Sequence, residues 1–236
     1  ERFPQADANR DGILTREEAE AFIKKRAEAK EGRQGAGRPE PARADVRYGP
    51  HERNVFDLWL PEGASSEKPV PVFVHFHGGG FVAGDKASFD PGAYLKQGYA
   101  VVSGNYRFVD GKDVLTPVPM RDAARAIQFI RHKAKEFGIR PDRIAVSGGS
   151  AGGVITMWIG YKPDMADPGN EDPVLRESTR VTCLVPIVGP TNLDPRWIVE
   201  HIGGGPEVHS SLPLFYGIKD MGELDAPEKR ALVEDA

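Results

Sequence analysis

Apolar and polar positions follow two kinds of pattern along the chain. Residues 54–60 mix apolar and polar positions like a strand with one buried face, and residues 70–77 form a continuous β-branched and aromatic run, like a strand buried on both faces. Strand-like stretches cover 54–60, 70–77, 99–106, 143–147 and 180–188, and helix-like stretches cover 119–137 and 151–161. Strands that alternate with helices predict an α/β fold with a mostly parallel sheet flanked by helices.

The helical stretch 119–137 has a clear apolar face and a clear end. Its apolar residues recur at helical spacing at Ala123, Ala124, Ile127, Ile130, Ala134 and Phe137. Gly138 follows as a natural C-terminal cap, because glycine readily adopts the left-handed conformation that ends helices. The last stretch, 189–236, contains no clear strand.

Composition narrows the class of protein. The 236 residues carry 31 Lys+Arg and 35 Asp+Glu, and the net charge of −4 offers no basic surface for nucleic acid. A single cysteine, Cys183, excludes an intrachain disulfide and a cysteine-rich zinc site, and its place in the apolar run 181–185 predicts a buried thiol. No apolar run approaches the roughly 18 residues of a membrane-spanning helix.

Three zones differ in composition. Residues 1–30 are highly charged and largely helical in pattern, and we expect a partial EF-hand there. Residues 31–43 contain three glycines and two prolines without a large apolar residue, which is typical of a linker. Residues 44–236 hold the alternating strands and helices, so we expect the α/β domain there.

A serine stands between a predicted strand and a predicted helix. Residues 148–152 are Gly-Gly-Ser-Ala-Gly, which matches G-x-S-x-G. The alternative is a tight glycine turn with an incidental serine, because such pentapeptides also occur by chance. The context favours a nucleophile, since a sharp strand-to-helix turn exposes the hydroxyl above the sheet at a helix N-terminus. Ser150 is the candidate.

A run of glycines follows an earlier strand. Residues 77–80 are His-Gly-Gly-Gly, and successive glycines leave backbone N–H groups unshielded, as an oxyanion hole needs. A phosphate loop is excluded because Asp85 separates Gly84 from Lys86, and a dinucleotide fingerprint is excluded because the glycines are contiguous. We expect His77 to shape this loop by hydrogen bonding, with a catalytic base as the alternative.

The two glycine motifs, 77–80 and 148–152, together resemble those of the α/β-hydrolase superfamily. The chain is similar to carboxylesterases of its hormone-sensitive-lipase and bacterial feruloyl or acetyl-xylan esterase-like branch. The resemblance covers roughly 45–195, with supporting stretches at 84–86, 105–107 and 189–192. It implies an α/β-hydrolase fold and cofactor-free chemistry. It also implies Ser150 as the nucleophile and an oxyanion hole formed by the N–H groups of Gly79, Gly80 and Ala151.

The acid and base of this family have no clear counterpart in the sequence. Its triad runs Ser, then Asp or Glu, then His, after later strands. After Ser150 the only histidines are His201 and His209, and either is an alternative for the base. We expect the acid, the base and the last two strands to lie beyond Ala236, so that the α/β domain is incomplete. The chain by itself should then be nearly inactive, because a serine hydroxyl without a base is a weak nucleophile.

The N-terminal zone contains the ligand spacing of an EF-hand loop. Counting from Asp7 as position 1, oxygen-bearing side chains stand at positions 1, 3, 5, 9 and 12, and a glycine stands at position 6. This spacing predicts a structural Ca²⁺ ion bound by Asp7, Asn9, Asp11, the carbonyl of Ile13 and Glu18, with Thr15 acting directly or through water. The alternative is a solvated acidic turn that caps a helix.

These motifs lead to two classes of function. The leading hypothesis is a serine carboxylic-ester hydrolase that acts on a small ester, such as one on an acylated polysaccharide, and carries a calcium site. The alternatives are a non-catalytic calcium-binding scaffold or adhesion protein with a degenerate hydrolase domain, and an amide or peptide hydrolase. The calcium motif suggests a periplasmic or secreted location. Aromatic candidates for the substrate pocket, all of which could instead be core, are Phe81, Trp158, Trp197, Phe215 and Tyr216.

Overall fold

The computed structural model describes Thr15, Glu18, Ala21 and residues 38–203 and 212–236. The chain divides into two compact units, Glu1–Pro39 and Glu40–Ala236. Most of the predicted calcium loop lies outside the described residues, and the described helices and strands with defined bounds belong to the second unit. No helix in the described part of the chain has the length and apolar character that crossing a membrane requires.

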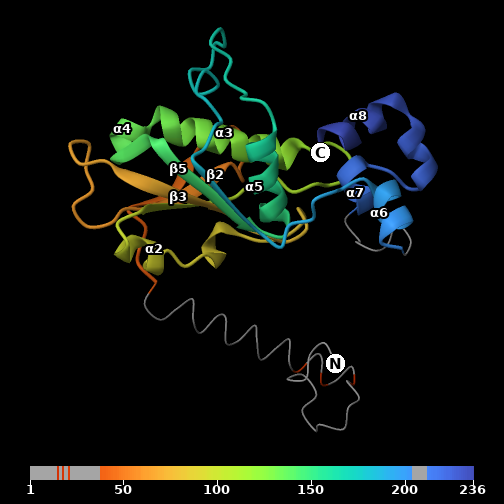
Figure 1. Cartoon of the computed structure of the whole chain (residues 1–236), viewed down its shortest axis with the longest axis horizontal. Coiled ribbons are helices and arrows are strands. Elements are labelled where there is room, and N and C mark those ends of the chain that lie inside the picture. The colour runs from red at the N-terminus through yellow and green to blue at the C-terminus, as the bar shows by residue number, and fades with distance from the viewer. Residues whose placement is uncertain (1–14, 16–17, 19–20, 22–37, 204–211) are drawn as a thin grey trace. The chain divides into compact units, whose positions relative to one another are not determined.

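A six-stranded mixed sheet forms the centre of the second unit (Figure 1). The strands lie in the order β1-β2-β4-β3-β5-β6; the β1–β2 and β2–β4 pairs are antiparallel and the other three are parallel. Their bounds are β1 (Arg43–Arg47), β2 (Val55–Trp59), β3 (Val70–Phe76), β4 (Ala100–Gly104), β5 (Ile139–Gly149) and β6 (Cys183–Ile187). The predicted fold class, a mostly parallel sheet flanked by helices, is confirmed.

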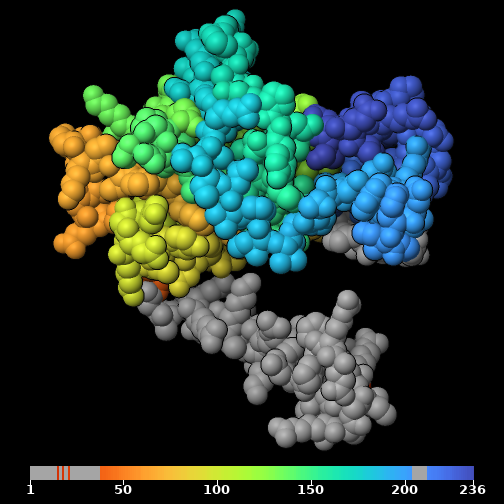
Figure 2. Space-filling view, viewed as in Figure 1, coloured from red at the N-terminus to blue at the C-terminus, as the bar shows by residue number. Residues whose placement is uncertain are grey.

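Helices cover both faces of this sheet (Figure 1). The long helix α3 lies on one face and packs against α5, and α2 lies on the other face. Helices α6, α7 and α8 gather beyond one end of the sheet and are drawn in shades of blue at the right of Figure 1 and Figure 2. The bounds are η1 (Lys86–Ser88), α2 (Gly92–Lys96), α3 (Val118–His132), α4 (Ala134–Phe137), α5 (Ala151–Tyr161), α6 (Pro195–His201), α7 (Leu212–Tyr216), η3 (Met221–Asp225) and α8 (Pro227–Asp235).

The predicted apolar helix face is the buried face of α3 and α4. All six of its residues, from Ala123 to Phe137, are at most 3% exposed. Gly138 ends α4 with φ of 65°, as the glycine cap predicts. The single helix predicted over 119–137 is interrupted, because Lys133 leaves helical dihedrals at φ −95° and ψ 8°.

Strand β6 is shorter and more exposed than the predicted strand over 180–188. It is the edge strand of the sheet and pairs with β5 on one side alone among the described residues. Val185 and Ile187 therefore remain 39% and 50% exposed, and Cys183 is exposed too. The prediction of a buried thiol was wrong, because apolar composition does not distinguish an edge strand from a central one.

Strand β1 was missed by the sequence analysis. Its residues are Arg-Ala-Asp-Val-Arg, and its first residue, Arg43, lies in the stretch assigned to the linker. The strand is mostly exposed and pairs only with β2 in the described structure. Such an edge strand has no apolar face that would reveal it in the sequence.

Strand β3 is a central strand with both faces covered, as predicted. One of its side chains is that of His75. Phe73 stacks on Tyr94 and His75 stacks on Phe89, each with ring centroids 4.1 Å apart. Nδ1 of His75 is buried and has no hydrogen-bond partner among the described residues. Burial, with a smaller effect of the neighbouring His77, lowers the pKa of His75 to about 4.

Replacing His75 with phenylalanine should remove an acid-sensitive part of the free energy of unfolding. The unfolded chain binds a proton at His75 near pH 6.5, whereas the folded chain resists protonation until about pH 4, so stability falls as the pH drops between these values. Between pH 7.5 and pH 5 we expect the wild type to lose about 2 kcal/mol more than His75→Phe. Urea denaturation at both pH values measures this, and equal losses in the two proteins would contradict it.

Candidate functional site

Ser150 stands on a strained turn between β5 and α5. Its φ of 54° and ψ of −118° are rare for a residue with a side chain. Its N–H donates to the Ile187 carbonyl oxygen at 2.9 Å, and its carbonyl oxygen accepts from the Val154 N–H at 3.0 Å, so the turn is held from two sides. Ser150 is exposed, and Ala151 beside it begins α5, where first-turn N–H groups have no partner within the helix.

Glycines allow α5 to approach the end of β3. A Cβ on Gly152 would overlap the carbonyl oxygen of Phe76, and a Cβ on Gly148 would overlap the backbone of Gly152. Backbone atoms cannot yield as a flexible side chain can, so these two positions exclude every other residue type. The glycines of the serine motif therefore set how closely helix and strand pack.

The glycine loop at 77–80 lies directly against the serine turn. A Cβ on Gly78 would come within 3.3 Å of Ser150 Cβ. Gly79 and Gly80 have φ of 118° and 60°, which lie in the region that favours glycine. In the described structure neither of their N–H groups donates to a backbone carbonyl. Both groups therefore remain able to bind an oxygen atom next to Ser150.

The side chain of His77, the first residue of this loop, is buried. It is 2% exposed, its Nδ1 donates to the Gly78 carbonyl oxygen at 2.7 Å, and its ring stacks on Tyr106 with centroids 4.4 Å apart. Burial lowers the pKa of His77 below its ordinary value. His77 is not among the residues that line the cavity beside Ser150, which favours the loop-shaping role over that of a base.

The chain that follows the glycine loop is tied to the sheet by charged groups whose role the sequence analysis missed. Lys86 Nζ lies 2.7 Å from Asp57 Oδ1 and 3.0 Å from Asp45 Oδ1. Although burial opposes it, hydrogen bonds to these two carboxylates raise the pKa of Lys86. The Asn105 side chain accepts from the Lys86 N–H at 2.6 Å and donates to Asp85 at 2.8 Å. The segment that follows the glycines is thereby fixed to β1, to β2 and to the residue directly after β4.

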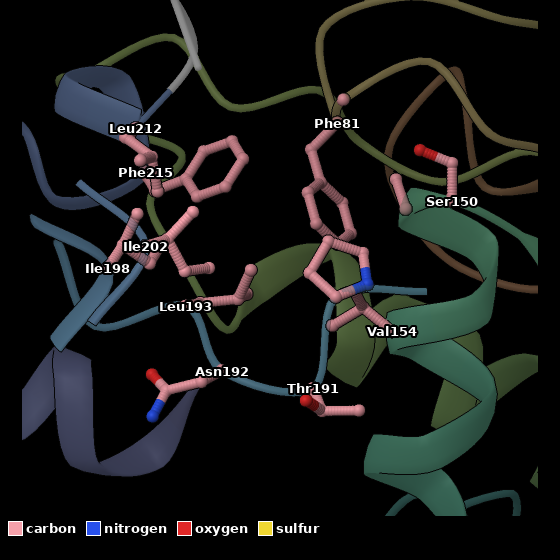
Figure 3. A pocket seen from close by; sticks show the side chains of 13 residues that line it. Phe81, Ser150, Val154, Thr191, Asn192, Leu193, Ile198, Ile202, Leu212 and Phe215 are labelled. Carbon is pink, nitrogen blue, oxygen red and sulfur yellow. The ribbon is translucent and has the colours of Figure 1, made fainter. Parts of the chain in front are cut away.

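A cavity of about 240 Å³ opens beside Ser150 (Figure 3). Its wall is mostly apolar and comes from the glycine loop, α5, the segment 190–193, α6 and α7. The figure shows Phe81, Leu193 and Phe215 around the central space, with Thr191 and Asn192 at its lower side. The lining residues are Gly80, Phe81, Ser150, Ala151, Val154, Pro190, Thr191, Asn192, Leu193, Ile198, Ile202, Leu212 and Phe215.

Two of the five aromatic candidates belong to this cavity. Phe81 and Phe215 line it and meet edge to face, with centroids 5.3 Å apart at 85°. Trp158 and Tyr216 are buried elsewhere, and Trp197 is 38% exposed on α6. The aliphatic lining residues from α6 and α7 were missed, because helices of five and seven residues are too short to show a periodic pattern.

No side chain of the described residues is hydrogen-bonded to Ser150 Oγ. Of the two candidate bases, His209 lies outside the described residues. His201 donates from Nδ1 to the Trp197 carbonyl oxygen at 3.0 Å, stacks on the Trp197 ring, and does not line the cavity. The described residues therefore supply a positioned serine and backbone donors without a base.

The predicted calcium ligands are only partly described. Asp7, Asn9, Asp11 and Ile13 lie outside the described residues. Glu18 Oε2 accepts from the Thr15 N–H at 3.1 Å and from the Thr15 hydroxyl at 2.8 Å, and the Glu18 N–H donates to Thr15 Oγ1 at 3.3 Å. This reciprocal arrangement is a capping box at the start of a helix.

A family model and several curated proteins match this chain. A family model described as BD-FAE matches residues 56–204. The chain is 31% identical over 156 residues to the probable isoprenylcysteine alpha-carbonyl methylesterase ICMEL1 of Arabidopsis thaliana, covering 64% of this chain and 31% of that protein. It is 30% identical over 149 residues to the probable carboxylic ester hydrolase LipM of Mycobacterium tuberculosis, covering 61% and 34%. The chain thus spans about a third of the length of these curated relatives.

A solved structure extends the similarity to the fold. The acetyl ester-xyloside bifunctional hydrolase from Caldicellulosiruptor lactoaceticus is 30% identical, with a TM-score of 0.52. The match covers 76% of this chain and 61% of that chain. Sequence and fold therefore point to the same group of hydrolases.

Gly152→Ala should destabilise the second unit strongly. The new methyl group has to displace the Phe76 carbonyl oxygen, so we expect a loss of at least about 3 kcal/mol in urea denaturation. Gly169→Ala is the matched control, since its Cβ would meet nothing closer than 3.7 Å. Equal stability of the two variants would show that α5 does not pack on β3 as described.

Proposed function

Because the chain belongs to the BD-FAE family and has the α/β-hydrolase fold, we propose that it is the serine-bearing part of a carboxylic-ester hydrolase. The observation that carries the proposal is the exposed Ser150 on its strained turn, next to the unpaired N–H groups of Gly79 and Gly80. A hydroxyl beside converging backbone donors suits attack on a carbonyl group. The esterase names of the relatives support ester substrates.

In the proposed mechanism the ester is cleaved through an acyl-enzyme. Ser150 Oγ forms a bond to the carbonyl carbon, its proton passes to a histidine base, and the carbonyl electron pair moves onto oxygen. The N–H groups of Gly79, Gly80 and Ala151 stabilise that oxyanion. Collapse expels the alcohol, which takes the proton from the base. Water then cleaves the acyl-enzyme by the same steps.

The base of this mechanism is not among the described residues around Ser150. A histidine held by a carboxylate fits the requirement, because the carboxylate fixes the imidazole tautomer and stabilises the imidazolium. His209 or a residue of another segment could supply it. The proposed activity is therefore that of the whole encoded protein, and the experiments below use that protein.

The cavity supports an acyl group that is apolar and larger than acetyl. Its volume of about 240 Å³ is many times the roughly 10–15 Å³ that one water needs, and a methyl group is about the size of a water. An acetyl group would leave most of the apolar space unfilled and lose dispersion contacts. Medium-chain and aromatic acyl groups fit better. For the alcohol side we propose a sugar or polysaccharide, which the xyloside hydrolase among the relatives supports.

The test is labelling and turnover by the protein as its gene encodes it. We expect a fluorophosphonate probe to label Ser150, and Ser150→Ala to abolish labelling and to lower kcat for p-nitrophenyl esters by at least about 10⁴-fold. From acetate to hexanoate, kcat/KM should rise about fourfold for each added methylene, as burial of a CH₂ group implies.

The matched control is Ser66→Ala, which removes an exposed hydroxyl bonded only to Glu67. It should behave as the wild type. Absence of both labelling and ester turnover would contradict the proposal and favour the non-catalytic scaffold. Faster turnover of amides than of esters would favour the amide hydrolase.

We propose further that residues 7–18 bind a structural calcium ion. The ligand spacing supports it, and so does the capping box of Thr15 and Glu18, since an EF-hand loop leads directly into a helix at its last ligand. When bound, the ion would supply cross-linking of the loop and no step of the ester chemistry. A single weak site suits the calcium-rich space outside the cytoplasm, where we propose that the protein resides.

Calorimetric titration with CaCl₂ should detect one binding event, lost in Asp7→Ala and in Glu18→Gln. Glutamine still forms the capping box, so Glu18→Gln removes a charged ligand without removing the helix start. Glu20→Gln, outside the twelve-residue loop, is the control and should bind as the wild type. The same heats for all four proteins would contradict calcium binding.

A further inference from the structure

A half-buried arginine joins the glycine loop to the sheet that supports it. Arg53 lies just before β2, and its Nε donates to the Tyr106 carbonyl oxygen at 2.8 Å. Its Nη2 donates to the Gly84 carbonyl oxygen at 3.2 Å. Its guanidinium carbon lies 3.7 Å from the centroid of the Phe108 ring. A guanidinium group stacked on an aromatic face and bonded at two nitrogens has one orientation.

In that orientation Arg53 also faces His77. Arg53 Nη2 lies 3.4 Å from His77 Nε2, and because an arginine nitrogen only donates, Nε2 must be the acceptor. On the other side His77 Nδ1 lies 2.7 Å from the Gly78 carbonyl oxygen, which only accepts. The two partners therefore require the same tautomer of the neutral ring, with its proton on Nδ1.

The surroundings of His77 also oppose a charged ring. Burial is the main cause that lowers its pKa, and the positive charge of Arg53 lowers it further, against the opposing effects of the Gly78 carbonyl, Asp85 and the Asn105 side chain. A second proton on Nε2 would face the guanidinium group directly. His77 is therefore neutral near pH 7 and has one preferred tautomer.

The tautomer of His77 determines the orientation of the peptide group between Gly78 and Gly79. The carbonyl and N–H of a trans peptide point in opposite directions. His77 Nδ1 holds the Gly78 carbonyl, so the Gly79 N–H points away from His77. Gly78 itself packs against the Ser150 side chain. With the other tautomer, Nδ1 would present a lone pair to the Gly78 oxygen and repel it.

We propose that Arg53 is a positioning residue, which holds His77 as the Nδ1–H tautomer and thereby aims the Gly79 N–H at the oxyanion. Its effect on catalysis rests on the proposed esterase function, whereas its effect on the His77 tautomer does not. Arg53 touches no reacting atom. It acts through His77 and the Gly78–Gly79 peptide.

The first test is the imidazole ¹⁵N spectrum of the chain labelled at histidine. The sequence contains six histidines, and a His77→Gln variant assigns the His77 signals. In the wild type at pH 7.5 we expect a pyrrole-like Nδ1 and a pyridine-like Nε2 at His77. Arg53→Met keeps the aliphatic stem and removes every donor, so it should shift the His77 signals toward a mixture of tautomers.

The second test is turnover of an ester by the same variants of the protein as its gene encodes it. Arg53→Met should lower kcat about 10- to 100-fold with KM changed less than about twofold, because an oxyanion donor acts in the transition state. Arg53→Lys should not restore kcat, since one ammonium cannot make the bonds of a planar guanidinium. Arg140→Met, which removes an exposed arginine paired with Asp142, is the matched control and should leave both readouts unchanged.

The two experiments distinguish failure of the Arg53 proposal from failure of the esterase proposal. An Nε2–H tautomer or a charged ring at His77 in the wild type would overturn the inference, and this measurement needs no Arg53 variant to fold. An unchanged Nδ1–H tautomer in Arg53→Met would also overturn it and leave Arg53 a packing residue. The expected tautomers without ester turnover in any protein would overturn the esterase function alone.

Discussion

The site depends on the contact between the first turn of α5 and the end of β3. Backbone meets backbone there, because a Cβ on Gly152 would overlap the Phe76 carbonyl oxygen and a Cβ on Gly148 would overlap the backbone of Gly152. Helix α5 begins directly after Ser150, and β3 leads directly into the glycine loop. This close approach therefore sets the distance between the Ser150 turn and the glycine loop at residues 77–80. The hydrogen bonds of His77 then orient the peptide groups of the glycine loop.

The features that could be predicted from the sequence are those that depend only on residues close together in the chain. Gly138 ends a helix because only its own φ matters, and the buried face of α3 follows from a spacing of three and four residues. The turn at Ser150 was predictable because strand, glycines and helix are contiguous in the chain. The proximity of residues 77–80 to this turn came from resemblance to a known family. Spacing alone does not bring segments seventy residues apart together.

The features that could not be predicted depend on neighbours distant in sequence. Cys183 sits in an apolar run typical of a central strand, and only the order of the sheet shows that β6 is an edge. Arg53 stands in a polar stretch that gives no hint of its contacts with residues 24 to 55 positions later. The cavity wall from α6 and α7 likewise has no local pattern. The triad base and the calcium ion remain predictions.

The backbone of Ser150 has a consequence for the stability of this protein. A residue with a side chain at φ 54° costs on the order of 1–3 kcal/mol, and glycine would adopt the same dihedrals with less strain. At this one position a chain with glycine would therefore be the more stable one. The serine hydroxyl is present at a cost in stability, which the packing of the rest of the sheet offsets.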